Sequence, residues 1–179
     1  MTSRFLAGAA DPTLDGGAGR AVAVTRRDFE VVMAPLYGQL VRRLVLVLGD
    51  QADAEDTAQE AYLRAFRAWP AFDGTDARAW LYTIALHGAF DQLRRRRRWF
   101  ARITRGPETP SYRDTVDPDL WAAIAGLEPR VRAALLASVL DGYTQREIAA
   151  MLSVAEGTVA SWLARARAAL RVELEPPGG

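Results

Sequence analysis

Apolar residues recur at helical spacing along most of this chain. From residue 29 to residue 48 they fall three or four positions apart, at Phe29, Val32, Met33, Leu36, Tyr37, Leu40, Leu44 and Leu48. Similar stretches run from about residue 50 to 69 and onward from residue 76. This period marks amphipathic helices, and the strict alternation of a half-buried strand is absent from the sequence. The pattern therefore predicts an all-α fold.

Capping residues, glycines and prolines mark where these helices begin and end. Thr25 and Asp28 are a candidate capping pair for the first helix, and Gly49 ends it. Pro35 lies inside it and predicts a kink or the start of another helix. The second helix runs from about Asp50 to Trp69, before Pro70, and the third begins near Asp76 after an Asp73-Gly74 turn.

The chain divides into two small helical domains, predicted at 25–99 and 118–174. The flexible linker between them, 100–117, contains Gly106, Pro107 and Pro110 and lacks helical periodicity. Asp117 caps a helix over about 118–126, and another spans about 129–141 up to Gly142. The Gly- and Ala-rich residues 1–24 and the last residues 175–179 are expected to be disordered tails.

Residues 144–171 have the form of a helix-turn-helix, in which the second helix enters the DNA major groove. Thr144 and Glu147 have the spacing of a capping box, Ser153 ends the first helix, and Val154 is expected to anchor the turn in the core. Gly157 and Thr158 open the second helix. Its predicted buried face holds Val159, Leu163, Ala166 and Leu170, and its outward side Ser161, Trp162, Arg165 and Arg167.

The net charge of +1 hides two opposed blocks. One is acidic, at Asp50, Asp53, Glu55, Asp56 and Glu60, and the other contains Arg94 to Arg98. This distribution predicts two different macromolecular partners. Every basic residue other than the single histidine is arginine, whose guanidinium can bind phosphate or guanine through two hydrogen bonds.

Several classes of function are excluded or disfavoured by what the sequence lacks. It has no cysteine, which excludes disulfides and cysteine zinc sites. His87 is alone on its helix, so we interpret it as structural and expect neither a metal nor a cofactor. No catalytic constellation is present, and enzymatic activity is not expected. No apolar run seems long enough to span a membrane, and 5–10 is too short for a signal peptide, so we expect a cytoplasmic protein without membrane insertion.

Several blocks, in order along the chain, resemble the extracytoplasmic-function (ECF) family of sigma-70 factors. Residues 49–69 (GDQADAEDTAQEAYLRAFRAW) are similar to region 2.2. The segment ARAWLYTIA at 77–85, followed by DQLRRRRR at 91–98, is similar to regions 2.3 and 2.4. The segment LEPRVR at 127–132 and the helix-turn-helix resemble region 4. The resemblance covers residues 28–172.

This resemblance implies a set of interfaces. Core RNA polymerase would bind through its β′ clamp helices and its β flap, with the clamp contacting Asp53, Glu55, Asp56, Gln59 and Glu60. Taken alone, this acidic block is more simply a solvated helix start that opposes the helix dipole. The resemblance places the −10 element at the loop and third helix, namely Phe72, Asp73, Gly74, Thr75, Asp76, Arg78, Trp80, Tyr82, Arg94, Arg95, Arg96, Arg97 and Arg98.

Some of these residues have simpler interpretations. The arginine run is also explained as a solvated helix end or a nonspecific phosphate patch. Trp80 fits the apolar face of its helix, and the core interpretation of it is favoured over base stacking. The −35 element would meet Thr144, Gly157, Thr158, Ser161, Trp162, Arg165 and Arg167.

The recognition helix departs from the family pattern, because Ala160, Trp162 and Ala164 stand where basic residues are common. Trp162 can face a thymine methyl, another protein or the core, and the sequence leaves these open. The function implied is that of an ECF sigma factor that binds core polymerase and recognises promoter DNA, with an anti-sigma factor as a further partner typical of the family. The alternative is a stand-alone helix-turn-helix regulator whose first domain senses a ligand or dimerises.

Overall fold

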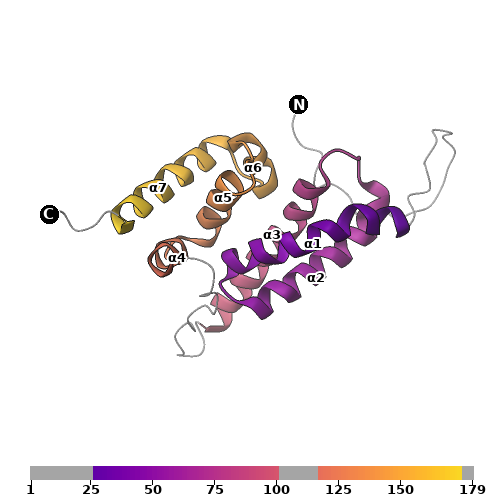
Figure 1. Cartoon of the computed structure of the whole chain (residues 1–179), viewed down its shortest axis with the longest axis horizontal. Coiled ribbons are helices and arrows are strands. Elements are labelled where there is room, and N and C mark those ends of the chain that lie inside the picture. The colour runs from indigo at the N-terminus through magenta and orange to yellow at the C-terminus, as the bar shows by residue number, and fades with distance from the viewer. Residues whose placement is uncertain (1–25, 101–116, 175–179) are drawn as a thin grey trace.

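The computed structural model describes residues 26–100 and 117–174, which form seven α-helices and one 3-10 helix without a strand. The first domain contains α1 (Arg26–Leu48), α2 (Gln51–Ala68), η1 (Trp69–Ala71) and α3 (Ala77–Phe100). The second contains α4 (Pro118–Ala125), α5 (Pro129–Val139), α6 (Gln145–Leu152) and α7 (Glu156–Leu174) (Figure 1). The predicted all-α, two-domain fold is confirmed. The tails predicted at 1–24 and 175–179, and the predicted linker apart from its end residues, lie outside the described residues.

The first domain is a three-helix bundle whose helices pack through small side chains. The turn between α1 and α2 contains Gly49, at a φ of 81°, and Asp50, whose carboxylate accepts a 2.8 Å hydrogen bond from the Asp53 amide. The buried side of α2 consists largely of alanine, which lets the bulky apolar residues of α1 and α3 approach closely. The large core residues are Phe29, Met33, Leu40, Leu44 and Leu81.

Two expectations for α1 need correction. The helix continues through Pro35, so this proline does not start a second helix. The stretch Arg27–Leu48 has a mean hydropathy of 1.5 and is long and apolar enough, by length and composition alone, to cross a membrane. The expectation that no apolar run reaches that length is therefore wrong. In this structure the buried apolar residues of α1 belong to the core of the bundle.

A group of aromatic side chains fixes the loop between η1 and α3. Phe72 stacks on Trp69 with ring centroids 4.9 Å apart and planes inclined by 17°, and it contacts Trp80 at 4.9 Å. Phe29 meets Trp69 edge-on at 5.4 Å. This cluster joins the start of α1, the end of α2 and the start of α3. Trp80 is half-buried within it, in agreement with the favoured core interpretation.

The second domain confirms the predicted helix-turn-helix. Thr144 and Glu147 form the capping box, with the Thr144 amide donating to Glu147 Oε2 at 2.7 Å and the Glu147 amide donating to Thr144 Oγ1 at 3.3 Å. Ser153 ends α6 in the left-handed conformation, at a φ of 53°. Val159, Leu163 and Ala166 are buried as expected, and Leu170 is half-buried. The helix predicted over 129–141 ends slightly earlier, at Val139.

The two domains pack against each other, with α5 and α6 lying on α1 and α3 (Figure 1). The contact brings the Asp141 carboxylate of the second domain onto Gln39 and Arg43 of α1. Arg78 of α3 reaches Tyr143 of the second domain. The sequence, which indicated two domains joined by a flexible linker, gave no sign of this contact.

We expect Thr144→Ala to lower the free energy of unfolding of the second domain by about 1 kcal/mol, because it removes one half of the capping box at α6. Urea unfolding followed by helical circular dichroism measures the change. Gln145→Ala is the control, since Gln145 is the exposed neighbour and makes no capping bond. Equal effects of the two substitutions would show that the box contributes nothing.

Candidate polymerase and promoter interfaces

Four of the five residues predicted to bind polymerase lie exposed on α2: Glu55, Asp56, Gln59 and Glu60. Glu60 pairs with Arg64 one turn later at 2.9 Å, and Glu55 accepts from Gln51. Both pairs lie within α2 at the surface, where such pairs hold side chains only weakly. The carboxylates therefore remain accessible to a basic partner.

The fifth residue, Asp53, has a different position. It is half-buried against α3, where its carboxylate accepts from Gln92 Nε2 at 3.0 Å and pairs with Arg96. Burial raises the pKa of Asp53, and the nearby Arg96 opposes that shift. Asp53 thus joins α2 to α3 rather than belonging to the exposed acidic face. Sequence analysis grouped it with the other four because it could not know which helix packs there.

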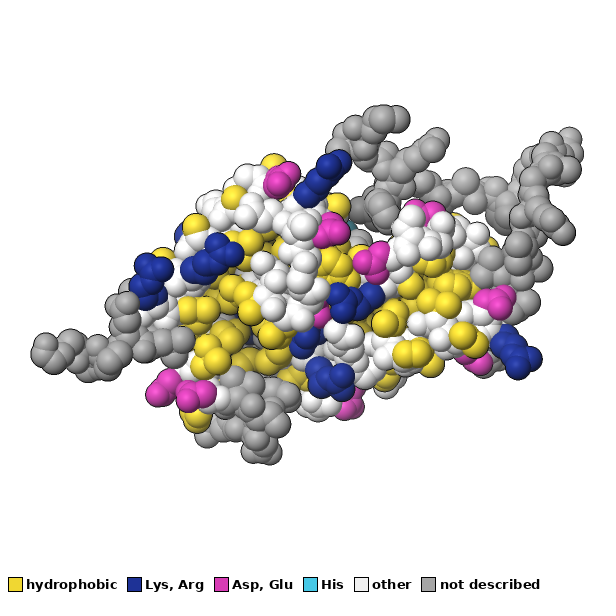
Figure 2. Space-filling view, turned by 45° about the horizontal axis from the view of Figure 1, so that its top comes forward, with side chains coloured by type: hydrophobic (Ala, Val, Ile, Leu, Met, Phe, Trp, Pro, Cys, Tyr) yellow, Lys and Arg dark blue, Asp and Glu magenta, His cyan; other side chains and the backbone are white. Residues whose placement is uncertain are grey.

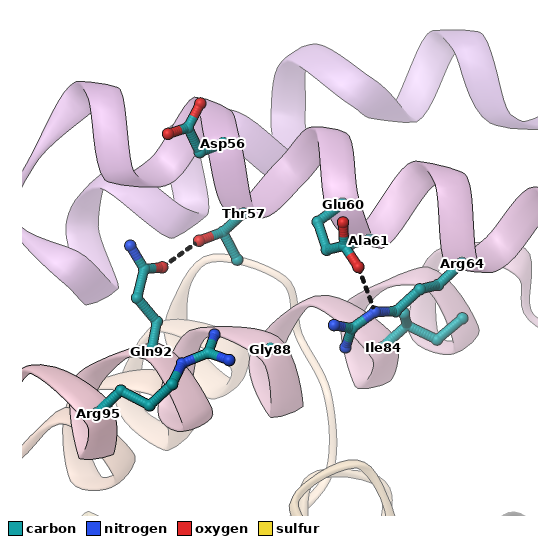
Figure 3. Close-up of a pocket in the computed structure, with 9 residues that line it drawn as sticks. All are labelled: Asp56, Thr57, Glu60, Ala61, Arg64, Ile84, Gly88, Gln92 and Arg95. Atoms are coloured by element: carbon teal, nitrogen blue, oxygen red, sulfur yellow. Dashed lines mark hydrogen bonds and ion pairs between the residues drawn. The ribbon is translucent and has the colours of Figure 1, made fainter.

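A groove of about 440 Å³ runs between α2 and α3 (Figure 3). Its α2 side carries Asp56 and Glu60, and its α3 side carries Arg95 next to the open space at Gly88. Thr57 Oγ1 donates to Gln92 Oε1 at 2.6 Å and bridges the two helices at this point. The groove combines both signs of charge on facing walls.

The residues of the arginine run take different positions. Arg94 pairs with Asp91 on its own helix, Arg96 pairs with Asp53, and Arg95 lines the groove. All three are exposed at the surface. Arg97 and Arg98 belong to α3 by their backbone, but their side chains lie outside the described residues. The prediction that an unbroken run covers every side of one helix is thus modified by two acidic partners.

Sequence analysis missed an apolar surface beside the acidic residues. Leu63 and Phe66 follow Gln59 by one and two helical turns and are 51% and 41% exposed. Val31 on α1 is 68% exposed, and Figure 2 shows hydrophobic side chains gathered over this end of the bundle, on the right. Such a patch is a typical sign of a protein interface. The spacing of Gln59, Leu63 and Phe66, opposite the buried alanines, was a signal that could have revealed it.

The loop before α3 presents four exposed residues: Asp73, Gly74, Thr75 and Asp76. Asp73 Oδ1 accepts from the Thr75 amide at 3.0 Å and from Thr75 Oγ1 at 2.7 Å, and these bonds lower the pKa of Asp73. Asp76 caps α3 by accepting from the Ala79 amide at 2.9 Å. Carboxylates repel phosphate, so this loop is suited to base edges, where a carboxylate can accept from cytosine.

Arg78 and Tyr82 lie at the contact between the domains instead of beside the exposed loop. Arg78 donates from Nε to the Tyr143 hydroxyl and from Nη2 to the Asp141 carbonyl, both at 2.9 Å. Tyr82 is only 5% exposed, and burial raises the pKa of Tyr82. Neither side chain is placed to meet DNA in this arrangement. Both were predicted from their place in a motif, which does not reveal that a second domain covers them.

The recognition helix α7 exposes Ser161, Arg165 and Arg167, as predicted. The dark blue side chains on the left of Figure 2 lie over α7. Trp162 differs from the prediction, because it is half-buried and packs against the core. At the start of the unit, Gly157 is exposed, Thr158 is half-buried, and the Thr144 hydroxyl is engaged in the capping box.

His87 is half-buried on α3 where α5 and α6 approach. Burial lowers its pKa, and a hydrogen bond to the Met151 backbone and the charges of Asp91, Arg130 and Arg94 modify that shift. Within 26–100 and 117–174, no group of three His, Cys, Asp or Glu residues is placed to hold a metal ion. His87 therefore has the surroundings of a packing residue, as expected.

Comparison with known proteins gives matches in both domains. Residues 33–99 match sigma-70 region 2, and residues 118–170 match sigma-70 region 4. The chain is 31% identical over 177 residues to the ECF RNA polymerase sigma factor SigL of Mycobacterium tuberculosis, covering 92% of this chain and 97% of SigL. The chain belongs to the ECF family of RNA polymerase sigma factors.

Other relatives of this ECF sigma factor differ in how much they share with it. The ECF RNA polymerase sigma factor SigE of Mycolicibacterium smegmatis is 34% identical over 156 residues, but the match spans 76% of this chain and only 61% of SigE. The fold is similar to that of the sigma factor RpoE from Bartonella quintana, solved with the anti-sigma factor NepR. That comparison has a TM-score of 0.71 and 24% identity, over 85% of this chain and 99% of RpoE.

We expect Trp162→Ala to lower the free energy of unfolding of region 4 by about 2 kcal/mol, because half of a large aromatic surface leaves the core. Arg165→Ala, on the exposed side of the same helix, should change it by less than about 0.5 kcal/mol. Chemical denaturation of both variants measures the difference. If Trp162→Ala is as mild as Arg165→Ala, Trp162 is not part of the core and its predicted contact with DNA gains support.

Proposed function

We propose that this sigma factor docks on core polymerase through the outer face of α2. The observation that carries the proposal is the combination, on one surface, of exposed carboxylates with exposed apolar side chains. A solvated helix start needs carboxylates but has no use for Leu63 and Phe66 at its surface. The β′ clamp helices are the proposed partner. Basic residues there would pair with Glu55, Asp56 and Glu60.

We infer that the two domains divide promoter recognition between them. The exposed loop 73–76 and the exposed arginines of α3 are proposed to meet the −10 element, with Arg94, Arg95 and Arg96 supplying phosphate contacts. The outward side of α7, at Ser161, Arg165 and Arg167, is proposed to enter the major groove at the −35 element. Region 4 is the proposed partner of the β flap.

The same proposal covers control and location. The relative from Bartonella quintana was crystallised with an anti-sigma factor, and a partner of that class is proposed for this chain as well. Sigma factors direct transcription initiation as regulators, and no catalytic activity of its own is proposed for this chain. It would act in the cytoplasm, where polymerase and promoter DNA are found.

We expect Asp56→Arg combined with Glu60→Arg to abolish co-purification with core polymerase and run-off transcription, because basic residues of the clamp would meet like charge. The fold should survive, since both residues are exposed. Asp119→Arg with Glu128→Arg makes the same change of charge at exposed positions of region 4 and is the control.

Unchanged co-purification of the α2 variant would contradict the proposed clamp contact. Failure of the unmodified chain to support run-off transcription from a panel of ECF-type promoters would contradict the proposed function itself.

We expect Arg165→Ala to weaken holoenzyme binding at promoters that depend on the −35 element, and Ser161→Ala to have a smaller effect. Loss of a base contact would cost about 1–3 kcal/mol and relax the preference at one base pair. Binding to a library of −35 variants by gel shift distinguishes this from a phosphate contact, whose loss weakens all sequences alike. If Arg165→Ala leaves both affinity and preference unchanged, α7 is not the reading helix.

A further inference from the structure

The contact between the domains is centred on one buried carboxylate. The side chain of Asp141 is only 1% exposed, although it lies in the turn between α5 and α6. Gln39 Nε2 donates to Asp141 Oδ1 at 3.1 Å, and Arg43 Nε lies 3.2 Å from Oδ1 and 3.1 Å from Oδ2. All of these side-chain donors come from α1, about 100 residues away in sequence. Asp141 therefore contributes its carboxylate to joining the domains.

A second residue, Arg132, bonds to backbone carbonyls in both domains. It is 7% exposed, and its Nη1 donates to Val47 O at 3.1 Å and Leu46 O at 3.4 Å in the last turn of α1. Its Nη2 donates to Ala125 O at 2.6 Å and Leu127 O at 3.1 Å in its own domain. A cation is favoured at the C-terminal end of a helix, and Arg132 thus places one at the ends of α1 and α4 together.

The same contact occupies a residue needed for the proposed promoter recognition. Arg78 spends two donors on Tyr143 and Asp141, and its guanidinium lies 5.0 Å from the Tyr143 ring centroid. The Thr75, Asp76 and Trp80 side of the adjoining loop shares a pocket of about 160 Å³ with Tyr143, Glu147 and Met151 of region 4. Region 4 therefore lies against the part of region 2 that would approach the −10 element.

This arrangement is incompatible with binding both promoter elements. The −10 and −35 elements are separated by about 25 base pairs, or roughly 85 Å of duplex. The recognition helix α7 has 19 residues and is about 28 Å long, and it packs on α6, which itself contacts α3. The two reading surfaces are too close together to reach both elements, so the domains must separate on the promoter.

The interface is also imperfect in a way that favours reversible opening. The Tyr82 hydroxyl is buried beside Asp141 and Arg43, and it has no hydrogen-bond partner among the described residues. A buried, unsatisfied hydroxyl is costly, and separation of the domains would return it to water. The apolar part of the contact is lined on the region 4 side mainly by Ala133, Leu136 and Ala137, around a cavity of about 20 Å³.

We propose that region 4 is latched onto region 2 in the free protein through Asp141, Arg132 and Arg78, and that this latch withholds the −10 reading surface until core polymerase separates the domains. The latch rests on the proposed function only in assigning Arg78 and the loop to the −10 element. The energy for opening comes from polymerase contacts that the closed form cannot make. The latch therefore sets the fraction of free protein that is competent to bind both elements.

The closed state can be tested in the free, full-length chain. The sequence has no cysteine, so cysteines at the exposed positions Ala52 and Ala168 carry spin labels at defined places. Pulsed electron paramagnetic resonance should give one short, narrow distance distribution for the otherwise unchanged chain. Asp141→Ala, and separately Gln39→Ala with Arg43→Ala, should both add a broad distribution at longer distances. Asp119→Ala, which removes an exposed carboxylate of region 4, should leave the distances unchanged.

The effect of the latch is measured as the rate of holoenzyme assembly with core polymerase. We expect both opened variants to assemble at least about tenfold faster than the unmodified chain, in proportion to the competent fraction. A broad distribution in the unmodified chain, or unchanged distances in both variants, would overturn the closed state. Longer distances without faster assembly would overturn the withholding role.

The α1 variant guards against misfolding of region 4, because it changes only region 2 residues, and circular dichroism checks helix content in both variants. The distances are measured without polymerase or DNA. A failure of the latch is thus distinguishable from a failure of the proposed function, which run-off transcription by the unmodified chain tests.

Discussion

The buried guanidinium of Arg132 is the interaction on which the arrangement of the two domains depends. It satisfies carbonyl groups at the end of α1 and in the α4–α5 turn, so two helix ends that would otherwise need water share one cation. Burial lowers the pKa of Arg132, and its Nε atom has no partner within the described residues. A charge held in this way is stable only while the surrounding carbonyls stay in place. The internal order of region 4 and its position on region 2 are consequently linked.

The packing of region 2 determines what remains available at its surface. Because alanine forms much of the buried side of α2, α1 and α3 lie close to it, and the longer polar side chains are directed outward or along the groove. The Thr57–Gln92 bond and the Asp53 contacts to α3 hold the groove at its α2 N-terminal end. The remaining carboxylates of α2 and the apolar Leu63 and Phe66 then form one continuous accessible surface.

Local features could be predicted from the sequence, whereas features that depend on a partner helix could not. Asp50, Asp117 and Thr144 cap helices as expected, because a cap involves only the next few residues. The helical period likewise identified Val159 and Leu163 as buried. By contrast, the position of Asp53 depends on α3 and that of Tyr82 on region 4. Periodicity shows which side of a helix is apolar, but not which charged residues will be covered by a distant segment.

The loop between η1 and α3 is held firmly at both ends and only lightly in between. Phe72 is fixed by ring stacking and Asp76 by its bond to the Ala79 amide, which leaves Asp73, Gly74 and Thr75 supported mainly by one another. Gly74 alone has a backbone requirement, with a φ of 80° and no atom near the place of a β-carbon. Substitutions at 73 and 75 therefore cost the bundle little stability. Evolution can vary the chemistry of this three-residue tip while the protein that carries it stays folded.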